Sequence, residues 1–399
     1  MKKGWERKTL ADVCEVISGG TPKTGIPAYW DGHHLWITPA EMGKRPSPYV
    51  GDTERQITDL GLRNSSAQML PPASVILSSR APIGHLVINT KPMATNQGCK
   101  GLIPRNQIQH KFLYYYLSSI VDFLNLLGTG ATFKELSGGK LKEVPIPVPP
   151  ISEQQRIVGI LDEAFENTAT AKANAKTNLQ FAGAIFESHL QCVFSERGMG
   201  WVEKHRPLED LCELIVDCEH KTAPTQDEGF PSIRTPNIGK GVLLLDSVYR
   251  VSEATYRAWT RRAEPRPGDL ILAREAPAGN VAVIPERTRV CLGQRTVLIR
   301  PRADVFAPEF LAFFLLQPEM QKKLLAHERG ATVQHVNMRD IRALDVGAIP
   351  PPDVQREIVR RITKVSDESN LLVSLYERKL AALEALKKSL LHEAFTGQL

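Results

Sequence analysis

The residues of this sequence with the types and grouping to do chemistry are cations, amides and hydroxyls that recur in two sets of loops. Arg and Lys can bridge O6 and N7 of guanine, Asn and Gln can pair with N6 and N7 of adenine, and the remaining side chains would hold phosphate. The first set is Thr21, Lys23, Thr38, Arg80, Gln97, Lys100, Thr132 and Lys134. The second set is His220, Lys221, Arg234, Asn237, Arg274, Gln294, Arg295, Thr332 and Gln334. As a group they predict a DNA-binding surface, whereas any one of them alone is more typical of a solvated surface side chain.

Sequence motifs for catalysis or for metal binding are missing. No G-x-x-x-x-G-K-[ST] loop occurs, because Gly138-Gly139-Lys140 is not followed by Ser or Thr, so an ATPase is not expected. The four consecutive residues Asp217-Cys218-Glu219-His220 cannot all face one ion, and His33-His34 is more typical of a loop pair than of a site. We therefore expect a non-catalytic chain that holds no metal and no cofactor.

Bulk properties restrict the class of protein. The chain has 399 residues, 42% of them hydrophobic, which is enough for two or more domains with separate cores. Its net charge of +6 permits nucleic-acid binding without requiring it. The six cysteines include no C-x-x-C pair, which argues against a zinc module and a disulfide framework. The sequence contains no run of about twenty apolar residues, and its first residues are not followed by the apolar core of a signal peptide. A cytoplasmic protein without a membrane partner is therefore expected.

The elements that must position these loops come in two copies. Leu10–Ile17 matches Leu208–Ile215, and Pro72–Gly84 aligns with Pro267–Gly279. Each half ends in a proline-rich exit, where missing N–H donors stop regular structure. Within each half, short apolar runs between Pro and Gly turns indicate strands, and other segments indicate helices. The expected domains are residues 1–150, a helical segment 151–197, a second domain 198–350 and a second helical segment 351–399.

Both helical segments carry a heptad pattern of side chains without proline. In the second segment the seam runs through Ile358, Ile362, Val365, Ser369, Leu372, Tyr376, Lys379, Leu383, Leu386 and Leu390. In the first it runs through Ile157, Leu161, Ala164, Thr168, Ala171, Ala175, Asn178, Ala182 and Ile185, which are smaller. Two helices of about 65 Å are expected to pair as an antiparallel coiled coil that places the domains at opposite ends. The alternative is that each helix packs on its own domain. The predicted fold class is α+β, with two tandem mixed α/β domains, paired long helices and a pseudo-two-fold internal repeat.

Several motifs resemble a known family. The pattern Trp5-x-x-x-x-Leu10, the segments Ser18–Pro22 and Ala94–Gln97, the exit Ile146–Ile157 and the ending Ala394–Leu399 are similar to the target-recognition domains and conserved helices of type I restriction-modification specificity subunits. The resemblance implies that each domain reads one part of a split double-stranded DNA site and that the helices set the spacer between the parts. It also implies two methyltransferase subunits docked on the chain, together with restriction and translocase subunits. S-adenosylmethionine, ATP and Mg²⁺ would be held by those partners.

The two copies also differ. Val354 occupies the place of Glu153, so a polar contact of Glu153 is not expected in both halves. The loops Gly25–Gln68 and Ala223–Glu264 diverge, which implies an asymmetric target. Two other classes of function stay open at this point: a protein-interaction scaffold with duplicated binding domains, and, with less support, a standalone DNA enzyme.

Overall fold

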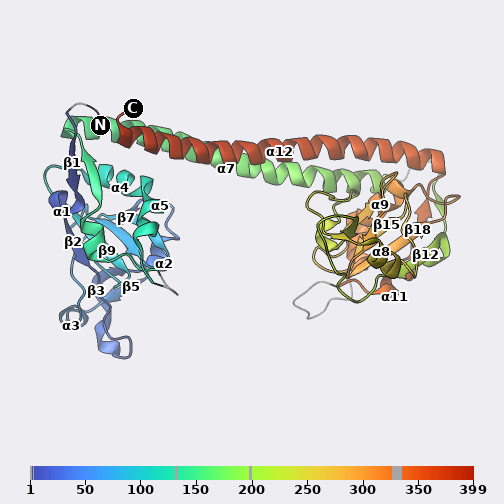
Figure 1. Ribbon diagram of the computed structural model, residues 1–399, viewed down its shortest axis with the longest axis horizontal. Coiled ribbons are helices and arrows are strands. Elements are labelled where there is room, and N and C mark those ends of the chain that lie inside the picture. Colours follow the sequence, from blue (N-terminus) through green and yellow to red (C-terminus); the bar gives the residue numbers. More distant parts are fainter. Residues whose placement is uncertain (1, 3, 131–133, 197–199, 326–334) are drawn as a thin grey trace. The chain divides into compact units, whose positions relative to one another are not determined.

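The computed structural model describes residues 2, 4–130, 134–196, 200–325 and 335–399 and is shown in Figure 1. The chain divides into two compact units: unit 1 comprises Met1–Ala175 and Arg378–Leu399, and unit 2 comprises Lys176–Glu377. Each unit thus holds one globular domain and part of each long helix, α7 (Ile151–Ser195) and α12 (Pro352–Thr396). No helix in the described part of the chain is long and apolar enough to cross a membrane.

Unit 1 is built on one large and two small sheets. Its globular elements are β1 (Glu6–Thr9), α1 (Leu10–Val13), β2 (Cys14–Ser18), β3 (Trp30–Ile37), α2 (Pro39–Met42), β4 (Tyr49–Val50), β5 (Arg55–Ile57), α3 (Asp59–Arg63), β6 (Val75–Ser79), β7 (Ile83–Asn89), β8 (Met93–Thr95), β9 (Cys99–Pro104), α4 (His110–Ser119), α5 (Val121–Leu127), α6 (Gly138–Lys142) and β10 (Pro145–Val148). The sheets have the strand orders β2-β9-β6-β7-β4, β5-β3-β8 and β1-β10. Every residue of β6 is buried, as expected for a central strand.

Unit 2 repeats this plan. Its globular elements are β11 (Val202–Glu203), β12 (Cys212–Asp217), β13 (Phe230–Ile233), β14 (Arg250–Val251), α8 (Glu253–Trp259), β15 (Leu270–Ala273), β16 (Val281–Val283), β17 (Cys291–Leu292), β18 (Thr296–Pro301), α9 (Pro308–Leu316), α10 (Pro318–Leu324), α11 (Met338–Arg342) and β19 (Ala348–Ile349). Its sheets have the strand orders β12-β18-β15-β16, β14-β13-β17 and β11-β19. The central strand of each small sheet has the same neighbours in both units, because β3 and β13 each pair antiparallel on one side and parallel on the other. The internal repeat read from the sequence is confirmed at the level of strand order.

A buried glutamine fixes the start of each long helix to its domain. In unit 1 the Gln154 side chain accepts a hydrogen bond from the Gln109 amide (2.9 Å) and donates to the carbonyls of Gln107 and Pro149 (both 2.9 Å). In unit 2 Gln355 accepts from the Ala307 amide (2.8 Å) and donates to the carbonyls of Val305 (2.7 Å) and Pro350 (2.9 Å). Both glutamines are completely buried. Because Gln109 and Ala307 are the N-caps of α4 and α9, the same side chain joins the same pair of helices in each unit.

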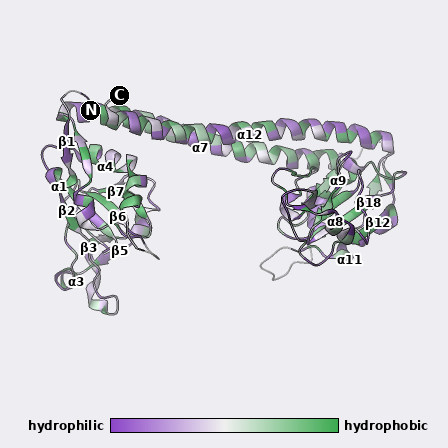
Figure 2. Cartoon of the chain, in the orientation of Figure 1, coloured by the Kyte–Doolittle hydropathy of each residue, from purple (hydrophilic) through white to green (hydrophobic). Residues whose placement is uncertain are grey.

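The long helices pair antiparallel within each unit. In unit 1, Lys387 lies over the Phe165 ring (5.3 Å) and Glu384 forms an ion pair with Lys172. The later residue of α7 therefore contacts the earlier residue of α12, as in an antiparallel pair. In unit 2, the Ser369 hydroxyl donates to the Ala182 carbonyl (2.6 Å). This close approach is possible because Ala182 is small, as the small residues of the first seam predicted. Figure 2 shows hydrophilic and hydrophobic residues alternating along both helices. The predicted fold class is confirmed.

In the middle of each helix the predicted seam is wrong by one residue at alternate positions, whereas Tyr376 and Leu383 in α12 and Ala182 in α7 are half-buried or buried as predicted. In α12, Leu372, Lys379 and Leu386 are exposed, while their neighbours Val373 and Leu380 are half-buried. In α7, Asn178 and Ile185 are likewise exposed, and the adjacent Leu179 and Phe186 turn inward instead. An undistorted α-helix has 3.6 residues per turn and drifts by about 20° per heptad from a strict seven-residue repeat. After two or three heptads the buried stripe therefore moves to the following residue, and a strict heptad reading misses the move.

Glu153 distinguishes the start of α7 from that of α12. Arg156 donates two hydrogen bonds to its carboxylate (2.7 and 3.0 Å) and Lys2 donates one (3.0 Å). These hydrogen bonds, that from Arg156 first, lower the pKa of Glu153 to about 2. Val354, at the equivalent place in α12, packs against the apolar core of unit 2. The polar contact belongs to one copy, as the sequence comparison indicated.

Replacing Glu153 with glutamine is expected to destabilise unit 1 near neutral pH and to matter little in strong acid. Because the folded pKa lies below the ordinary value of 4.5, the stabilisation is complete above that value and is lost as the pH falls from there towards about 2. Urea midpoints of wild type and Glu153→Gln, measured from neutral pH down to about pH 3, should therefore converge. Glu163→Gln, at an exposed position of α7, is the matched control. A gap between wild type and Glu153→Gln that stays constant with pH would contradict this account.

Candidate nucleic-acid interface

In unit 1 the predicted contact residues gather at one edge of the sheets, around the turn between β8 and β9. The Asn96 amide side chain of this turn donates to the Thr21 hydroxyl (2.9 Å), and the Gly19 and Gly20 amides donate to the carbonyls of Cys99 and Thr95. These bonds hold the end of β2 against the turn, where Gln97 is exposed. A side chain on Gly19 or Gly20 would collide with backbone atoms, which explains the glycines.

The other described candidates of the first set lie beside this turn or support it. Arg80 follows β6 and comes within 3.8 Å of the Glu135 carboxylate, next to the exposed Lys134. Lys100 is buried in β9, and its ammonium donates a hydrogen bond to the Ser18 hydroxyl (3.2 Å). Its side chain therefore stabilises the end of β2 and is not exposed to solvent. The Thr38 hydroxyl caps α2 by accepting from the Glu41 amide (3.2 Å).

In unit 2 the second set occupies the equivalent edge. Gln294, in the turn before β18, donates to the His220 carbonyl (3.1 Å), so the segment after β12 is held as its counterpart is in unit 1. The Gly293 amide donates to the Ile233 carbonyl, and this places the neighbouring Arg234 at the same edge. Arg234 is exposed and lies over the Tyr249 ring (4.3 Å), while the Asn237 side chain accepts from the Arg234 amide (3.1 Å).

A further parallel links Lys23 with Lys221. Both side chains are exposed, and in each case the lysine carbonyl accepts a hydrogen bond from a tryptophan ring: Trp30 in unit 1 (3.3 Å) and Trp259 in unit 2 (3.4 Å). The two tryptophans stand at different places in their domains, Trp30 at the start of β3 and Trp259 at the end of α8. The copies therefore reach a similar loop anchor with divergent segments.

Charged groups at the edge of unit 2 form a connected network. The Arg274 guanidinium donates to the Asp217 carboxylate (2.8 Å) and to the Val336 carbonyl (2.9 Å), and it contacts the His335 ring (2.9 Å). The Glu275 carboxylate in turn contacts His335 (3.1 Å) and Arg295 (2.6 Å). Arg274 is only 13% exposed, whereas Arg295 is 63% exposed. We expect Arg295 and Arg234 to reach DNA and Arg274 to hold the edge in shape.

Three predicted residues, Thr132, Thr332 and Gln334, lie outside the described residues. The remaining candidates, described above, come together at two equivalent edges, while direct contact with DNA stays a prediction for each. Sequence reasoning missed the groups that organise these edges: Asn96, Asp217, Glu275 and His335. A signal existed for Asn96, which lies inside the Ala94–Gln97 motif. Asp217 was considered only as a metal ligand, and its link to Glu275 through Arg274 and His335 could not be predicted because these residues are far apart in sequence.

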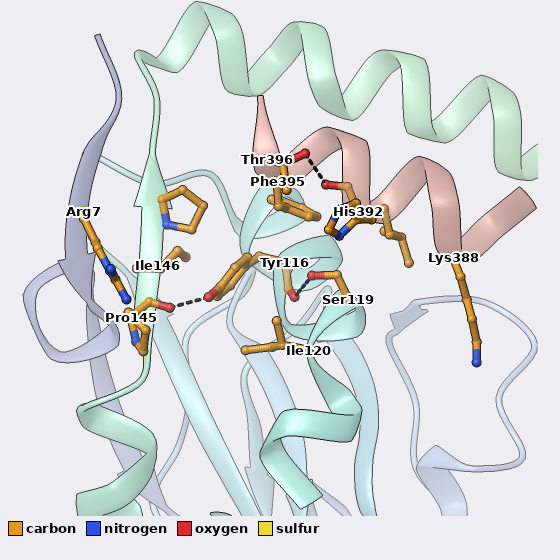
Figure 3. Close-up of a pocket in the computed structure, with 12 residues that line it drawn as sticks. Arg7, Tyr116, Ser119, Ile120, Pro145, Ile146, Lys388, His392, Phe395 and Thr396 are labelled. Carbon is orange, nitrogen blue, oxygen red and sulfur yellow. Dashed lines mark hydrogen bonds between the residues drawn. The ribbon is translucent and has the colours of Figure 1, made fainter. Parts of the chain in front are cut away.

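A second feature of unit 1 is a cavity of about 500 Å³ where α4, β10 and the last turns of α12 meet. Figure 3 shows the rings of Tyr116 and Phe395 in its wall and Arg7 and Lys388 at its margins. Among the described residues that line it, no nucleophile is hydrogen-bonded to a base, so the cavity has no catalytic pair. In unit 2 the cavity lined by Phe194, the counterpart of Phe395, measures only about 30 Å³, with the Trp201 ring among its walls.

Known proteins share this duplicated plan. The model of the type I restriction modification DNA specificity domain matches the chain twice, at residues 2–180 and 202–381. The chain belongs to the type I restriction-modification DNA specificity family. Both matched ranges contain one of the polar edges and part of α7 or α12, so the family's repeating unit is a globular domain together with helix.

Relatives within the specificity family match different shares of the chain. The type I restriction enzyme MjaIX specificity subunit of Methanocaldococcus jannaschii is 38% identical over 170 residues, which are 41% of this chain and 39% of that protein. The EcoBI specificity subunit of Escherichia coli is 23% identical over 352 residues, covering 82% of this chain and 74% of that protein. The EcoR124I/EcoR124II specificity subunit of E. coli is 30% identical over 197 residues, covering 48% of each.

Solved structures share the fold. A chain from a structure described as the structural basis of complex assembly and conformational transition of the type I R-M system has a TM-score of 0.76 at 19% identity, covering 100% of this chain and 99% of that one. The HsdS subunit of Thermoanaerobacter tengcongensis has a TM-score of 0.57 at 19% identity, covering 100% and 98%. At this identity the similarity shows a common fold.

Proposed function

We propose that this member of the specificity family is the DNA-reading subunit of a type I restriction-modification complex and that each unit reads one part of a split, asymmetric DNA site. The observation that carries the proposal is the repetition of one polar edge on two copies of the same fold. The edges are built from equivalent turns, yet they present different side chains, Gln97 beside Thr21 in unit 1 and Gln294 beside Arg234 and Arg295 in unit 2. Different donors on equivalent edges suit two different base sequences.

Phosphate contacts should supply much of the affinity. Exposed Lys23 and Lys134 in unit 1 and exposed Lys221 and Arg295 in unit 2 flank the proposed reading turns. Cations at these places would release counterions from the DNA backbone, so binding should weaken steeply with salt. The Arg295 side chain is 63% exposed although its partner Glu275 is 19% exposed, so phosphate can approach the guanidinium from the solvent side.

Catalysis would come from partner subunits. The long helices offer them an apolar surface: in unit 2, Phe181 and Leu371 are each 64% exposed, and Ile185, Leu372 and Leu375 are exposed near them in sequence. Exposed apolar side chains in such number are typical of protein-protein contact sites. We propose that two methyltransferase subunits dock there, bringing S-adenosylmethionine, and that restriction and translocase subunits bring ATP and Mg²⁺. The protein-interaction scaffold is less favoured, because family membership accounts for the polar edges as well as the helices.

Co-expression with a type I methyltransferase subunit from the same organism tests the function. The purified complex, given S-adenosylmethionine and a library of DNA duplexes, should methylate only duplexes that contain one split motif. The chain alone should transfer no methyl group to the same duplexes. Stable co-purification combined with methylation that ignores sequence would support the scaffold and contradict the proposal.

A further inference from the structure

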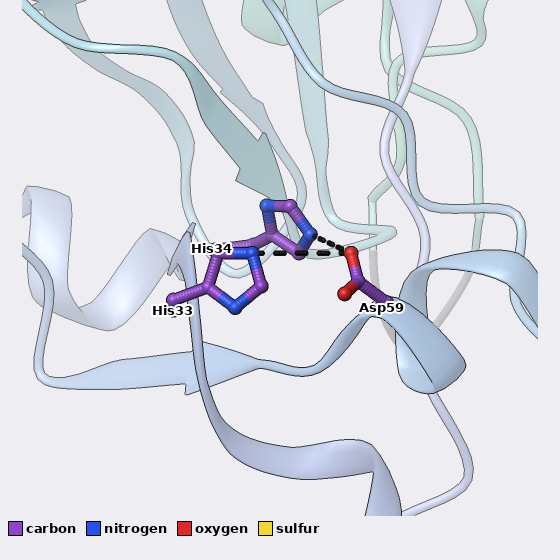
Figure 4. Close-up of side chains that lie close together, drawn as sticks. All are labelled: His33, His34 and Asp59. Carbon is purple, nitrogen blue, oxygen red and sulfur yellow. Dashed lines mark hydrogen bonds and ion pairs between the residues drawn. The ribbon is translucent and has the colours of Figure 1, made fainter.

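Two imidazoles and a carboxylate, none of them among the residues assigned to DNA reading, converge on the surface of unit 1. The ligand atoms of His33, His34 and Asp59 all lie within 4.8 Å of one another. The Nε2 atom of His34 is 2.7 Å from an Asp59 carboxylate oxygen, and the Nε2 atom of His33 is 3.8 Å from the same oxygen. Figure 4 shows both rings directed towards this carboxylate.

An irregularity in β3 brings the two neighbouring histidines together. Successive side chains of a regular strand point to opposite faces, which would separate consecutive imidazoles. In β3, however, Trp30 and His34 both pair with Ile57 of β5, so the intervening residues form a bulge. Bulges re-aim side chains. As a result the rings of His33 and His34 lie on the side of Asp59, with their centroids 4.1 Å apart and their planes tilted by 42°.

The third ligand is held in place by the start of α3. Thr58 caps this helix by accepting a hydrogen bond from the Gly61 amide (3.0 Å), which fixes the position of the neighbouring Asp59. An aspartate carboxylate is ordinarily ionised at neutral pH and can serve as a metal ligand. His34 is only 19% exposed, whereas His33 and Asp59 are 70% and 61% exposed, so an ion here would keep water in its remaining positions.

We propose that His33, His34 and Asp59 form a binding site for a divalent transition-metal ion, with Zn²⁺ as the best-suited probe. Imidazole nitrogens with one carboxylate oxygen are a ligand set that Zn²⁺ and related borderline ions prefer, whereas Mg²⁺ prefers oxygen alone. Coordination through the Nε2 of His34 replaces its present hydrogen bond to Asp59, and the ring proton then resides on Nδ1. The bound ion joins β3 to α3 across the divergent segment Gly25–Gln68.

Zn²⁺ titration of the full chain, freed of metal with EDTA and monitored by competition with a chromophoric chelator, tests the site. Wild type should bind one Zn²⁺ that excess Mg²⁺ does not displace. His33→Ala and Asp59→Asn should each weaken the affinity for Zn²⁺ by at least about tenfold. Zinc should also raise the thermal unfolding temperature of the wild-type chain and leave that of both variants unchanged, because only a site formed in the folded state stabilises it.

His205→Ala is the matched control for these variants. His205 is also exposed and also contacts two carboxylates, Glu203 (3.0 Å) and Asp345 (3.2 Å), but it contributes a single imidazole. Its replacement should leave Zn²⁺ affinity unchanged. The proposal is overturned if wild type binds no Zn²⁺, if His33→Ala binds it as tightly as wild type, or if His205→Ala removes as much binding as His33→Ala.

Discussion

Replacing Gln154 with alanine is expected to lower the free energy of unfolding of unit 1 by about 3–5 kcal/mol, because it leaves three buried backbone groups without partners at about 1–3 kcal/mol each. The groups are the Gln109 amide and the carbonyls of Gln107 and Pro149. Gln355→Ala should act equally strongly on unit 2. Differential scanning calorimetry of the two variants should show which thermal transition moves.

Gln155→Ala provides the control, because Gln155 is the exposed neighbour of Gln154 on the same turn of α7. The free energy of unfolding of Gln155→Ala should stay within about 0.5 kcal/mol of that of wild type, as for most surface substitutions. If Gln154→Ala and Gln155→Ala unfold alike, the buried glutamine does not anchor the helix, and the link between each domain and its helix must lie in the apolar contacts instead.

Inserting four residues into both long helices is expected to lengthen the DNA spacer of the preferred site by about one or two base pairs. Four residues add about 6 Å to a helix and make slightly more than one turn, which keeps the paired faces nearly aligned, and one base-pair step measures about 3.4 Å. The insertions belong next to Lys172 in α7 and Glu384 in α12, because these side chains already pair across the two helices. The measurement is the methylated motif produced by the complex with its methyltransferase subunit.

An insertion in α7 alone is the control for the spacer experiment. It adds length to one helix only, so the seam loses register and the chain should lose stability without acquiring a new spacer. An unchanged spacer in the double insertion would contradict the expectation, implied by the family resemblance, that the helices set the spacer between the two parts of the site.

Local patterns in the sequence were enough to predict the repeat, the helices and the polar loops, but not the contacts that join distant segments. The match of Leu10–Ile17 with Leu208–Ile215 reports directly on equivalent structure in both units. The role of Gln355 was overlooked because two of its three partners belong to the distant loop at Val305–Ala307. The convergence of Asp59 with His33 depends on a strand bulge, which has no reliable signature in the residue pattern.

Sequence type also says little about whether a cation is available to a ligand. Arg274 and Arg295 were equivalent candidates on the sequence, yet the guanidinium of Arg274 is bound by Asp217 and by the Val336 carbonyl, while that of Arg295 is mostly exposed. The difference comes from His335 and Val336, which both contact the Arg274 guanidinium. Burial of this kind is a tertiary property, and the spacing of residues along the chain does not encode it.

The methylated motifs of cells that express the chain with its methyltransferase subunit test the central claim most directly, when wild type is compared with Gln97→Ala and Gln294→Ala. These glutamines occupy equivalent turns, before β9 in unit 1 and before β18 in unit 2. Wild type should methylate one asymmetric motif made of two parts separated by a fixed spacer. Gln97→Ala should relax or change one part only, and Gln294→Ala only the other. A continuous motif, or the same part altered by both substitutions, would contradict the assignment of one reading surface to each unit.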